Sequence, residues 1–207
     1  MLPFKVLFSI LFTSLMVLSD TGPNSAGTGT NDAGVGSAAW DNPSRIVSSN
    51  TSYAIVYGAG DRTSNYLKAT NFGFSVPSGA TIDGVKVEIE KRATMDYSTG
   101  YIRDVEVKLI KGGTISGDNK GNTSTNWSLT QSYVTHGGAT DLWGLSLTDA
   151  DVNASNFGVS IYVFINNDDP DMDEVYAYVD HIRVTVYYTA GGGGGSSTAN
   201  PLLFIGN

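Results

Sequence analysis

The segment from Val85 to Glu90 alternates apolar and charged residues without interruption, and a turn-forming stretch, residues 78–84, precedes it. Successive side chains of a β-strand point to opposite faces, so this alternation predicts a strand with one face in a core and the other in water. No window of helical periodicity extends beyond a turn or two. The chain is therefore expected to fold mainly from β-strands.

Further segments show the same pattern and predict about eight strands in total. The expected strands are residues 45–47 and 52–57 (a first pair or one bent strand), 66–76, 85–93, 102–110, 126–133, 157–165 and 175–186. Val105, Val107 and Leu109 are expected to point into the core, and strand 157–165 is expected to be covered on both faces. Short strands separated by turn signals predict an all-β fold, an antiparallel β-sandwich of jelly-roll type.

The last strand contains a change of register. Its apolar residues fall into two sets of opposite parity, namely 175, 177, 179 and 182, 184, 186. A single-residue slip would turn one set toward solvent, so a β-bulge at Asp180-His181 is expected to keep both sets in one core. Earlier in the chain, a short helical turn is expected within residues 146–156, with Thr148 or Asp149 as its N-cap.

The ends of the chain differ in composition from the predicted domain, residues 39–189. Residues 1–19 carry one positive charge followed by a mostly apolar run, which is typical of a signal peptide; an uncleaved anchor and a buried segment are the alternatives. Residues 20–38 and 190–200 are rich in small and polar residues and are expected to be a flexible linker and a flexible tether. Residues 201–207 are largely apolar again.

Composition excludes several functions. The chain has 12 basic and 20 acidic residues and a formal net charge of −8, and such a surface repels nucleic acid. It has no cysteine, which excludes disulfides, thiolate catalysis and cysteine metal sites. Neither a Gly-x-Ser-x-Gly nucleophile motif nor a His-Glu-x-x-His metal motif is present. Membrane contact is expected only through residues 1–19, if they are uncleaved.

Two pairs of residues resemble catalytic pairs but favour a structural role. Asp180 precedes His181, yet adjacent residues of a strand point to opposite faces, which prevents a direct hydrogen bond unless the bulge redirects one of them. Glu88 and Glu90 share one face of a strand, and paired carboxylates hydrolyse glycosides. Glutamates interleaved with lysines are more typical of a solvated sheet. No catalytic residue is therefore expected, and the protein is not expected to be an enzyme.

Residues 166–174 form the densest polar cluster in the sequence. Oxygen-bearing side chains occupy every second position, at Asn167, Asp169, Asp171 and Asp173, and such ligands bind hard cations such as calcium. The EF-hand pattern is absent, because no glycine or distal glutamate follows in register. The alternative is a solvated acidic hairpin loop without metal.

The three tryptophans, Trp40, Trp127 and Trp143, are candidates for core packing or for ligand contact. Exposed aromatic rings pack against the apolar C–H faces of sugars, and Trp127 follows a polar run, which makes it a candidate for an exposed position. Trp127 with Tyr97 and Tyr101 would then form a glycan-binding platform. Packing in or at the edge of the core is the alternative for each tryptophan, and Trp143 is expected to close one end of the sandwich.

An apolar strand on a glycine-rich tether is poorly placed to add to its own core. The residues concerned are Leu202, Leu203, Phe204 and Ile205. Such a strand could complete the sheet of a neighbouring subunit by β-strand addition, which would make the protein a homo-oligomer or polymer. The alternative is a tail with no partner.

Six short motifs of the predicted domain are distinctive as a set. They are Trp40-Asp41-Asn42-Pro43, Leu67-Lys68-Ala69-Thr70-Asn71-Phe72-Gly73-Phe74, Val76-Pro77-Ser78-Gly79-Ala80-Thr81-Ile82-Asp83-Gly84, Asp141-Leu142-Trp143-Gly144, Asn153-Ala154-Ser155-Asn156-Phe157-Gly158 and Val179-Asp180-His181-Ile182. As a set, over about residues 38–189, they resemble a recurrent, largely uncharacterised β-sandwich module of phage structural proteins and bacterial surface proteins. The resemblance implies a structural or adhesive role and supplies no catalytic residues.

Together these observations predict a non-enzymatic structural subunit of a secreted, extracellular-surface or virion appendage, such as a filament or fibre assembled by β-strand addition. The alternative is a carbohydrate-binding module of a secreted or tail-fibre protein, and a hydrolase is the least favoured hypothesis. Calcium is the only cofactor that the sequence indicates. The expected partners are further copies of the chain and a glycan.

Overall fold

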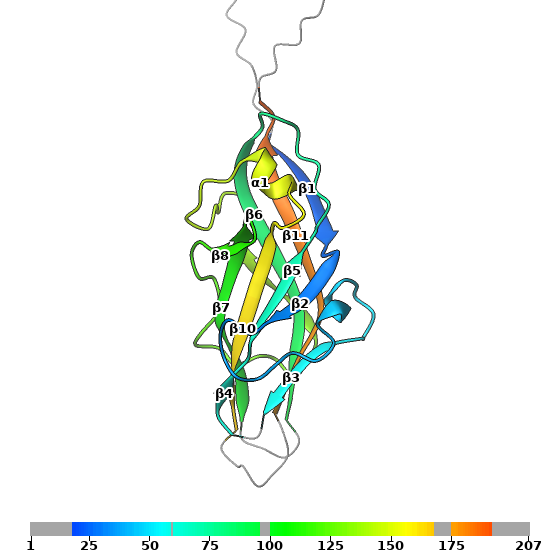
Figure 1. Ribbon diagram of the computed structural model, residues 1–207, viewed down its shortest axis with the longest axis vertical. Coiled ribbons are helices and arrows are strands. Elements are labelled where there is room, and N and C mark those ends of the chain that lie inside the picture. The colour runs from blue at the N-terminus through cyan, green and yellow to red at the C-terminus, as the bar shows by residue number, and fades with distance from the viewer. Residues whose placement is uncertain (1–17, 59, 96–99, 168–174, 192–207) are drawn as a thin grey trace, which may run out of the picture.

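The computed structural model describes residues 18–191 apart from residue 59 and the segments 96–99 and 168–174. Its strands form two antiparallel sheets that pack against each other around one hydrophobic core (Figure 1). The predicted all-β antiparallel sandwich is therefore confirmed.

The two sheets share the strands almost equally. Sheet A has the order β1 (Leu18–Ser25), β11 (Val175–Thr189), β6 (Thr81–Met95) and β9 (Ser132–Gly137), with β3 (Ala54–Gly58) also paired to β11. Sheet B has the order β2 (Thr28–Asp32), β5 (Tyr66–Thr70), β10 (Gly158–Asn166), β7 (Tyr101–Lys111) and β8 (Thr114–Ser116), with β4 (Arg62–Thr63) also paired to β10. The first and last strands of the described chain, β1 and β11, lie side by side in sheet A (Figure 1).

The core between the sheets follows the predicted alternation. In β6, the apolar residues Val85, Val87 and Ile89 are fully buried. The alternate residues Glu88 and Glu90 are only partly covered. Strand β10 has buried residues on both of its faces, as Val159 and Ser160 show, because it lies in the middle of sheet B. Each fully buried apolar side chain of this size contributes about 1.5–3 kcal/mol to folding.

Two tryptophans are part of this core. Trp40 and Trp143 are buried, and their indole N–H groups donate to the carbonyl oxygens of Asn65 and Val85, each at 2.9 Å. Burial of an indole is stable when its one donor is satisfied in this way. Core packing, one of the two alternatives for these residues, is therefore confirmed.

The bulge predicted in β11 is present. Val179 pairs with Lys91 of β6 and His181 pairs with Glu90, so Asp180 is the extra residue. The apolar residues on either side are all buried, namely Val175, Ala177, Val179, Ile182, Val184 and Val186. One inserted residue thus keeps two sets of opposite parity in the same core.

A second bulge, which the sequence did not reveal, lies in β7. Asp104 pairs with Val163 of β10 and Glu106 pairs with Tyr162, so Val105 is the extra residue. Val105 is only half-buried, and the prediction that it points into the core is wrong. The bulge instead places Asp104 on the buried side of the strand.

The prediction of a flexible linker at residues 20–38 is also wrong. Most of this segment forms β1, which pairs with β11, and β2, which pairs with β5. Ala26, between the two strands, is buried. Edge strands gain most of their stability from backbone hydrogen bonds, so small polar residues can form them without an apolar pattern.

Three expected strand positions also differ, for local reasons. Residues Pro43–Ile46 form a short 3₁₀ helix rather than a strand, with proline at its first turn. Strand β5 ends at Thr70 because Asn71 adopts a left-handed φ of 60°. The strand expected over residues 126–133 begins only at Ser132.

The predicted helical turn is present as α1, Asp149–Asn153, with Thr148 as its N-cap. The Thr148 hydroxyl accepts from the Asp151 backbone N–H at 3.1 Å, and the Asp151 carboxylate accepts from the Thr148 N–H at 2.9 Å. This reciprocal capping box satisfies two donors that a helix N-terminus would otherwise leave unpaired.

No helix among the described residues is both long and apolar enough to cross a membrane. The predicted signal or anchor segment lies almost wholly outside the described residues, and only Leu18 and Ser19 are seen, paired in β1 with Thr189 and Tyr188. The predicted assembly residues Leu202, Leu203, Phe204 and Ile205 also lie outside the described residues.

Candidate functional site

A pocket of about 220 Å³ lies where β6, β7 and β9 meet the loop that follows β8. Its lining combines an aromatic ring, an aliphatic side chain, a charged pair and several hydroxyl and amide groups. The residues are Trp127, Val134, Lys91, Asp104, Asn122, Thr125, Asn126, Ser128 and Ser132. Although most of these residues are polar, the atoms that they expose to the pocket are mostly apolar, and an apolar surface with a few polar groups is the usual form of small-ligand sites.

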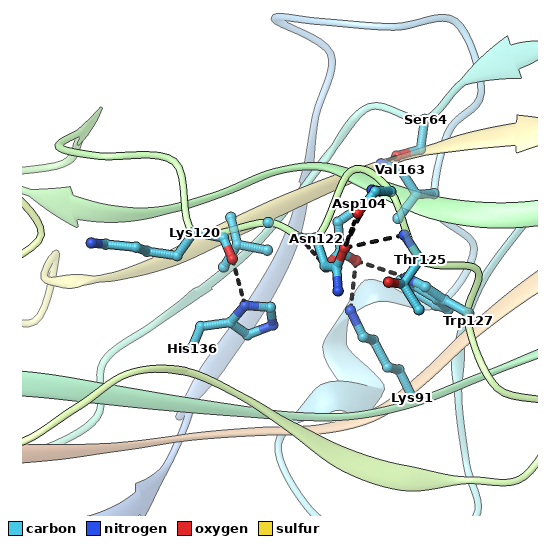
Figure 2. Close-up of polar contacts among 12 residues, drawn as sticks. Ser64, Lys91, Asp104, Lys120, Asn122, Thr125, Trp127, His136 and Val163 are labelled. Carbon is cyan, nitrogen blue, oxygen red and sulfur yellow. Dashed lines mark hydrogen bonds and ion pairs between the residues drawn. The ribbon is translucent and has the colours of Figure 1, made fainter.

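The charged pair is almost fully enclosed. Lys91 is 4% exposed and Asp104 is 2% exposed, and Lys91 Nζ lies 2.5 Å from Asp104 Oδ1. The same carboxylate accepts the Trp127 indole N–H on Oδ1 at 2.7 Å and the Asn122 backbone N–H on Oδ2 at 3.0 Å. Figure 2 shows these donors converging on Asp104 from different segments of the chain.

The ammonium of Lys91 is less completely satisfied than the carboxylate. An ammonium has three N–H donors, and among the described residues Asp104 is the only hydrogen-bond acceptor of Lys91. Lys91 Nζ also lies 4.4 Å from the centroid of the Trp127 ring, which is a cation–π contact. Because Lys91 lines the pocket, an oxygen atom entering the pocket can accept a further hydrogen bond from it.

Local folding explains how these groups meet. Lys91 has the same parity in β6 as the buried residues before it, so the strand directs it inward. The β7 bulge turns Asp104 inward from the opposite sheet. The backbone N–H of Trp127 donates to the Ile102 carbonyl at 2.8 Å, and this bond fixes the loop along β7.

Electrostatics at the pocket favour the ion pair. Burial alone would raise the pKa of Asp104, but the charge and hydrogen bonds of Lys91 and the Asn122 N–H outweigh it and lower that pKa. Burial lowers the pKa of Lys91, and the charge of Asp104 opposes this shift. Each group thus opposes the effect of burial on the pKa of its partner.

His136 lies next to this pair on β9 but does not line the pocket. Its Nδ1 is 2.9 Å from the Lys120 carbonyl oxygen, so Nδ1 is assigned the proton (Figure 2). Its Nε2 is buried and has no hydrogen-bond partner among the described residues. Burial and the charge of Lys91 lower the pKa of His136, which keeps the ring neutral at pH 7.

The predicted glycan platform is only partly described. Trp127 is 7% exposed, so an exposed ring is not found and packing in the core, the other interpretation of this residue, is confirmed; its indole N–H donates to a buried carboxylate. Tyr101 does not line the pocket, and the Arg103 guanidinium lies over its ring at 4.2 Å. Tyr97 lies outside the described residues. The structure therefore does not combine Trp127 and Tyr101 in one exposed surface.

A different aromatic surface, which the sequence analysis missed, covers the outer side of sheet A. We call it the tyrosine face, and it consists of Tyr53, Tyr57, Tyr176, Tyr178 and Arg92. Tyr57 pairs across the strands with Tyr176, their rings 5.3 Å apart, and Arg92 lies 4.3 Å from the Tyr178 ring. Tyr57 is 40% exposed. Its sequence signal was the alternation of tyrosines with buried residues in β11.

The Asp180-His181 pair does not form a dyad. Asp180 accepts from the backbone N–H of Thr51 at 3.0 Å and from Gln131 Nε2 at 2.9 Å. His181 lies 2.7 Å from the Tyr133 hydroxyl through Nδ1 and 2.9 Å from Ser25 Oγ through Nε2. The two side chains therefore bind separate partners.

The other carboxylate pair is likewise engaged by neighbours. Glu88 accepts from Arg183 at 3.1 Å and lies 3.3 Å from Lys86. Glu90 accepts from Gln131 Nε2 at 3.0 Å. Both carboxylates are partly covered and engaged by neighbouring side chains.

Only one of the predicted calcium ligands is described. Asn167 is buried, and its side-chain amide nitrogen donates to the Gly58 carbonyl at 3.2 Å. Asp169, Asp171 and Asp173 lie outside the described residues, so the calcium site stays a prediction. Elsewhere in the described chain, no three His, Asp or Glu side chains gather closely enough to hold a metal ion.

No protein-family model and no curated protein matches this chain. It is similar to the CBM22-1 xylan-binding domain of Paenibacillus barcinonensis Xyn10C, with 8% identity, 84% of this chain and 97% of that domain covered, and a TM-score of 0.35. It is also similar to a β-sandwich carbohydrate-binding module with promiscuous specificity, with 15% identity, 83% and 58% covered, and a TM-score of 0.33. At these values neither likeness bears on what this chain binds, and the resemblance to the phage and surface module stays a prediction.

Proposed function

We propose that this protein is a non-catalytic carbohydrate-binding β-sandwich whose pocket holds one sugar residue. The observation that carries the proposal is the lining of the pocket, where the Trp127 ring and Val134 provide apolar contact and a buried ammonium provides a hydrogen-bond donor. A sugar ring presents the complementary surfaces, an apolar C–H face and an edge of hydroxyl oxygens.

The size and rim of the pocket support this ligand. Its 220 Å³ is below the roughly 300–1,000 Å³ of sites for drug-sized molecules, which suits a single ring or the end of a chain. Four exposed residues of the lining, Asn122, Asn126, Ser128 and Ser132, carry amide and hydroxyl groups. The amide oxygens of Asn122 and Asn126 already accept hydrogen bonds within the protein, so these two residues offer their amide N–H groups to the hydroxyl oxygens of a sugar. A polyhydroxylated ring is the ligand that uses such groups most fully.

The lining favours binding over hydrolysis. Most glycoside hydrolases use two carboxyl groups flanking the scissile bond, whereas Asp104 is the one carboxylate among the described residues that line this pocket. That carboxylate already accepts three hydrogen bonds, so three of its roughly four acceptor positions are committed to the fold. We therefore assign the site a recognition role, in a secreted or surface protein as residues 1–19 predict.

The appendage hypothesis stays a prediction beside this one, and the two are compatible. Its assembly strand lies outside the described residues. One possible docking edge is already occupied, because the Asn119 side chain accepts from the Val107 N–H at 3.0 Å and donates to the Val105 carbonyl at 2.8 Å. Asn119 thereby takes the place of a neighbouring strand along this part of β7.

A nitrogen-15 NMR titration tests the proposal. The probes are glucose, galactose, mannose, xylose and N-acetylglucosamine, each to about 10 mM, which would reveal dissociation constants near 1 mM. We expect at least one sugar to shift the indole signal of Trp127, assigned by its absence in Trp127→Phe. The indole signals of Trp40 and Trp143 serve as internal controls, because both are bonded in the core.

Two substitutions in β9 test whether the sugar binds in the pocket. Ser132 lines the pocket from β9, so Ser132→Phe should fill the pocket and abolish the shift. Thr135 is exposed and has the opposite parity in β9, so Thr135→Phe should leave the shift unchanged. If no sugar moves the Trp127 signal, or if Ser132→Phe binds like wild type, the proposal is wrong.

A further inference from the structure

We infer that the pocket selects neutral sugar residues and rejects uronic acids, because its ammonium is already neutralised by a buried carboxylate. This inference rests on the proposed function and adds the charge class of the ligand. It follows from the balance of charge and hydrogen bonds at the Lys91–Asp104 pair.

The charges that line the pocket sum to zero. Lys91 and Asp104 are the only charged residues of the described lining, and they bind each other. Arg103 precedes Asp104 in the sequence but does not line the pocket. Its guanidinium lies over the Tyr101 ring, and its Nε donates to the Asn126 amide oxygen at 2.7 Å. A carboxylate placed beside this buried pair would add a negative charge that no further cation of the described lining compensates, which is unfavourable.

The hydrogen bonds lead to the same conclusion. Asp104 already accepts from Lys91, Trp127 and Asn122, whereas Lys91 has one acceptor for three donors among the described residues. The unused N–H groups of Lys91 therefore need a neutral acceptor, such as a hydroxyl or ring oxygen of a sugar. They do not need a second anion, because Asp104 already supplies the negative charge. An anion that bound Lys91 strongly would compete with Asp104 and weaken the pairing of that buried carboxylate.

Matched sugar pairs test the inference on the wild-type protein at pH 7. Glucose and glucuronate differ at one carbon, where a hydroxymethyl group replaces a carboxylate, and galactose and galacturonate form a second pair. For whichever pair shifts the Trp127 indole signal, we expect the neutral member to bind at least about tenfold more tightly. Equal or tighter binding of the uronate would overturn the inference while leaving carbohydrate binding intact.

A charge variant reverses the expected selectivity. Asp104→Asn keeps the shape and the acceptor oxygen for Trp127 but leaves the charge of Lys91 uncompensated, so the preference for the neutral sugar should fall at least about tenfold or reverse. The control is Asp118→Asn, because Asp118 is largely exposed and pairs with Lys120 outside the pocket. In Asp118→Asn, the ratio of affinities for the neutral sugar and the uronate should equal that of wild type.

The outcomes are separable. An unchanged neutral-to-acidic ratio in folded Asp104→Asn would overturn the charge argument, and if that variant does not fold, the wild-type pairs alone decide. If neither member of either pair nor any other neutral sugar shifts the Trp127 signal, the proposed function fails and the inference fails with it.

Discussion

Lys91 and Arg92 are consecutive residues of β6, and each places a cation over an aromatic ring at nearly the same distance. Lys91 Nζ lies 4.4 Å from the Trp127 centroid inside the sandwich, and the Arg92 guanidinium lies 4.3 Å from the Tyr178 centroid on the tyrosine face. Strand alternation separates them, because neighbouring side chains point to opposite sides of a sheet. The same contact type thus occurs once in the pocket and once at the outer surface.

The difference between the two regions lies in what surrounds the cation. Lys91 is enclosed, and the charge of Asp104 opposes the lowering of its pKa by burial; Asp104 in turn accepts a hydrogen bond from Trp127. Arg92 is only partly covered and has water as an alternative partner. Pocket residues are therefore coupled to folding, whereas residues of the tyrosine face can be changed with little effect on the rest of the molecule.

The largest expected effect comes from removing each cation in turn. Lys91→Met leaves Asp104 buried without its counter-ion, which should reduce the free energy of unfolding by about 3–5 kcal/mol. Arg92→Met removes two partly exposed cation–π contacts, with Tyr178 and Tyr53, each worth about 0.5–1 kcal/mol. Urea unfolding followed by fluorescence measures the loss in free energy of unfolding of each variant. Both substitutions lie in β6, so they are compared within one strand.

A double variant separates the loss of charge from the loss of packing. Lys91→Met combined with Asp104→Leu removes the stranded carboxylate, so it should be more stable than Lys91→Met alone. Equal losses in Lys91→Met and Arg92→Met would show that the enclosed and exposed cations are energetically alike, and the distinction between the two regions would not hold.

A smaller effect is expected from pH, and it should act on the pocket region. The pKa of His136 is lowered by burial and by the charge of Lys91, so below about pH 6.5 the unfolded chain takes up a proton that folded His136 resists. Stability should therefore fall as pH decreases from 7 to 5. The lowered pKa of Asp104 adds a further loss only near and below about pH 4.

Melting temperatures of three proteins across pH 5–7 check this prediction. The melting temperature should fall less steeply with decreasing pH in His136→Asn than in wild type. The fall that remains in this variant is due to His181, whose pKa is also lowered by burial. Arg92→Met should keep the wild-type slope, because the tyrosine face contains no histidine. A wild-type slope in His136→Asn would mean that His136 is not the responsible group.

The sequence predicted the framework of both regions but not their chemistry. Alternation in β6 placed Val87 and Ile89 inward, and the same parity places Lys91 inward, a signal that could have been used. The inward turn of Asp104 could not be predicted, because the β7 bulge interrupts an apparently regular strand and depends on pairing with β10. Without Asp104, no pattern indicated that Trp127 would be buried.

The N-terminal strands and the tyrosine face were missed for a different reason. Strands β1 and β2 are held by backbone pairing with β11 and β5, which leaves no hydrophobic period to detect. The tyrosine face brings β3 and β11 together, and their tyrosines are more than a hundred positions apart in the chain. Local patterns predict which side of a strand is buried, whereas neighbours across a sheet come from topology.

The smallest expected effect on stability tests whether the tyrosine face takes part in binding. Tyr57→Ala removes a 40% exposed ring that contacts Tyr176 across the strands, a pair of a kind worth about 0.2–1 kcal/mol. If the pocket alone binds sugar, Tyr57→Ala should retain the wild-type Trp127 shift and the wild-type affinity in the NMR titration. Loss of affinity in Tyr57→Ala with an unchanged melting temperature would instead place the glycan on the tyrosine face, because a ring so weakly coupled to folding can affect binding only through contact with the ligand.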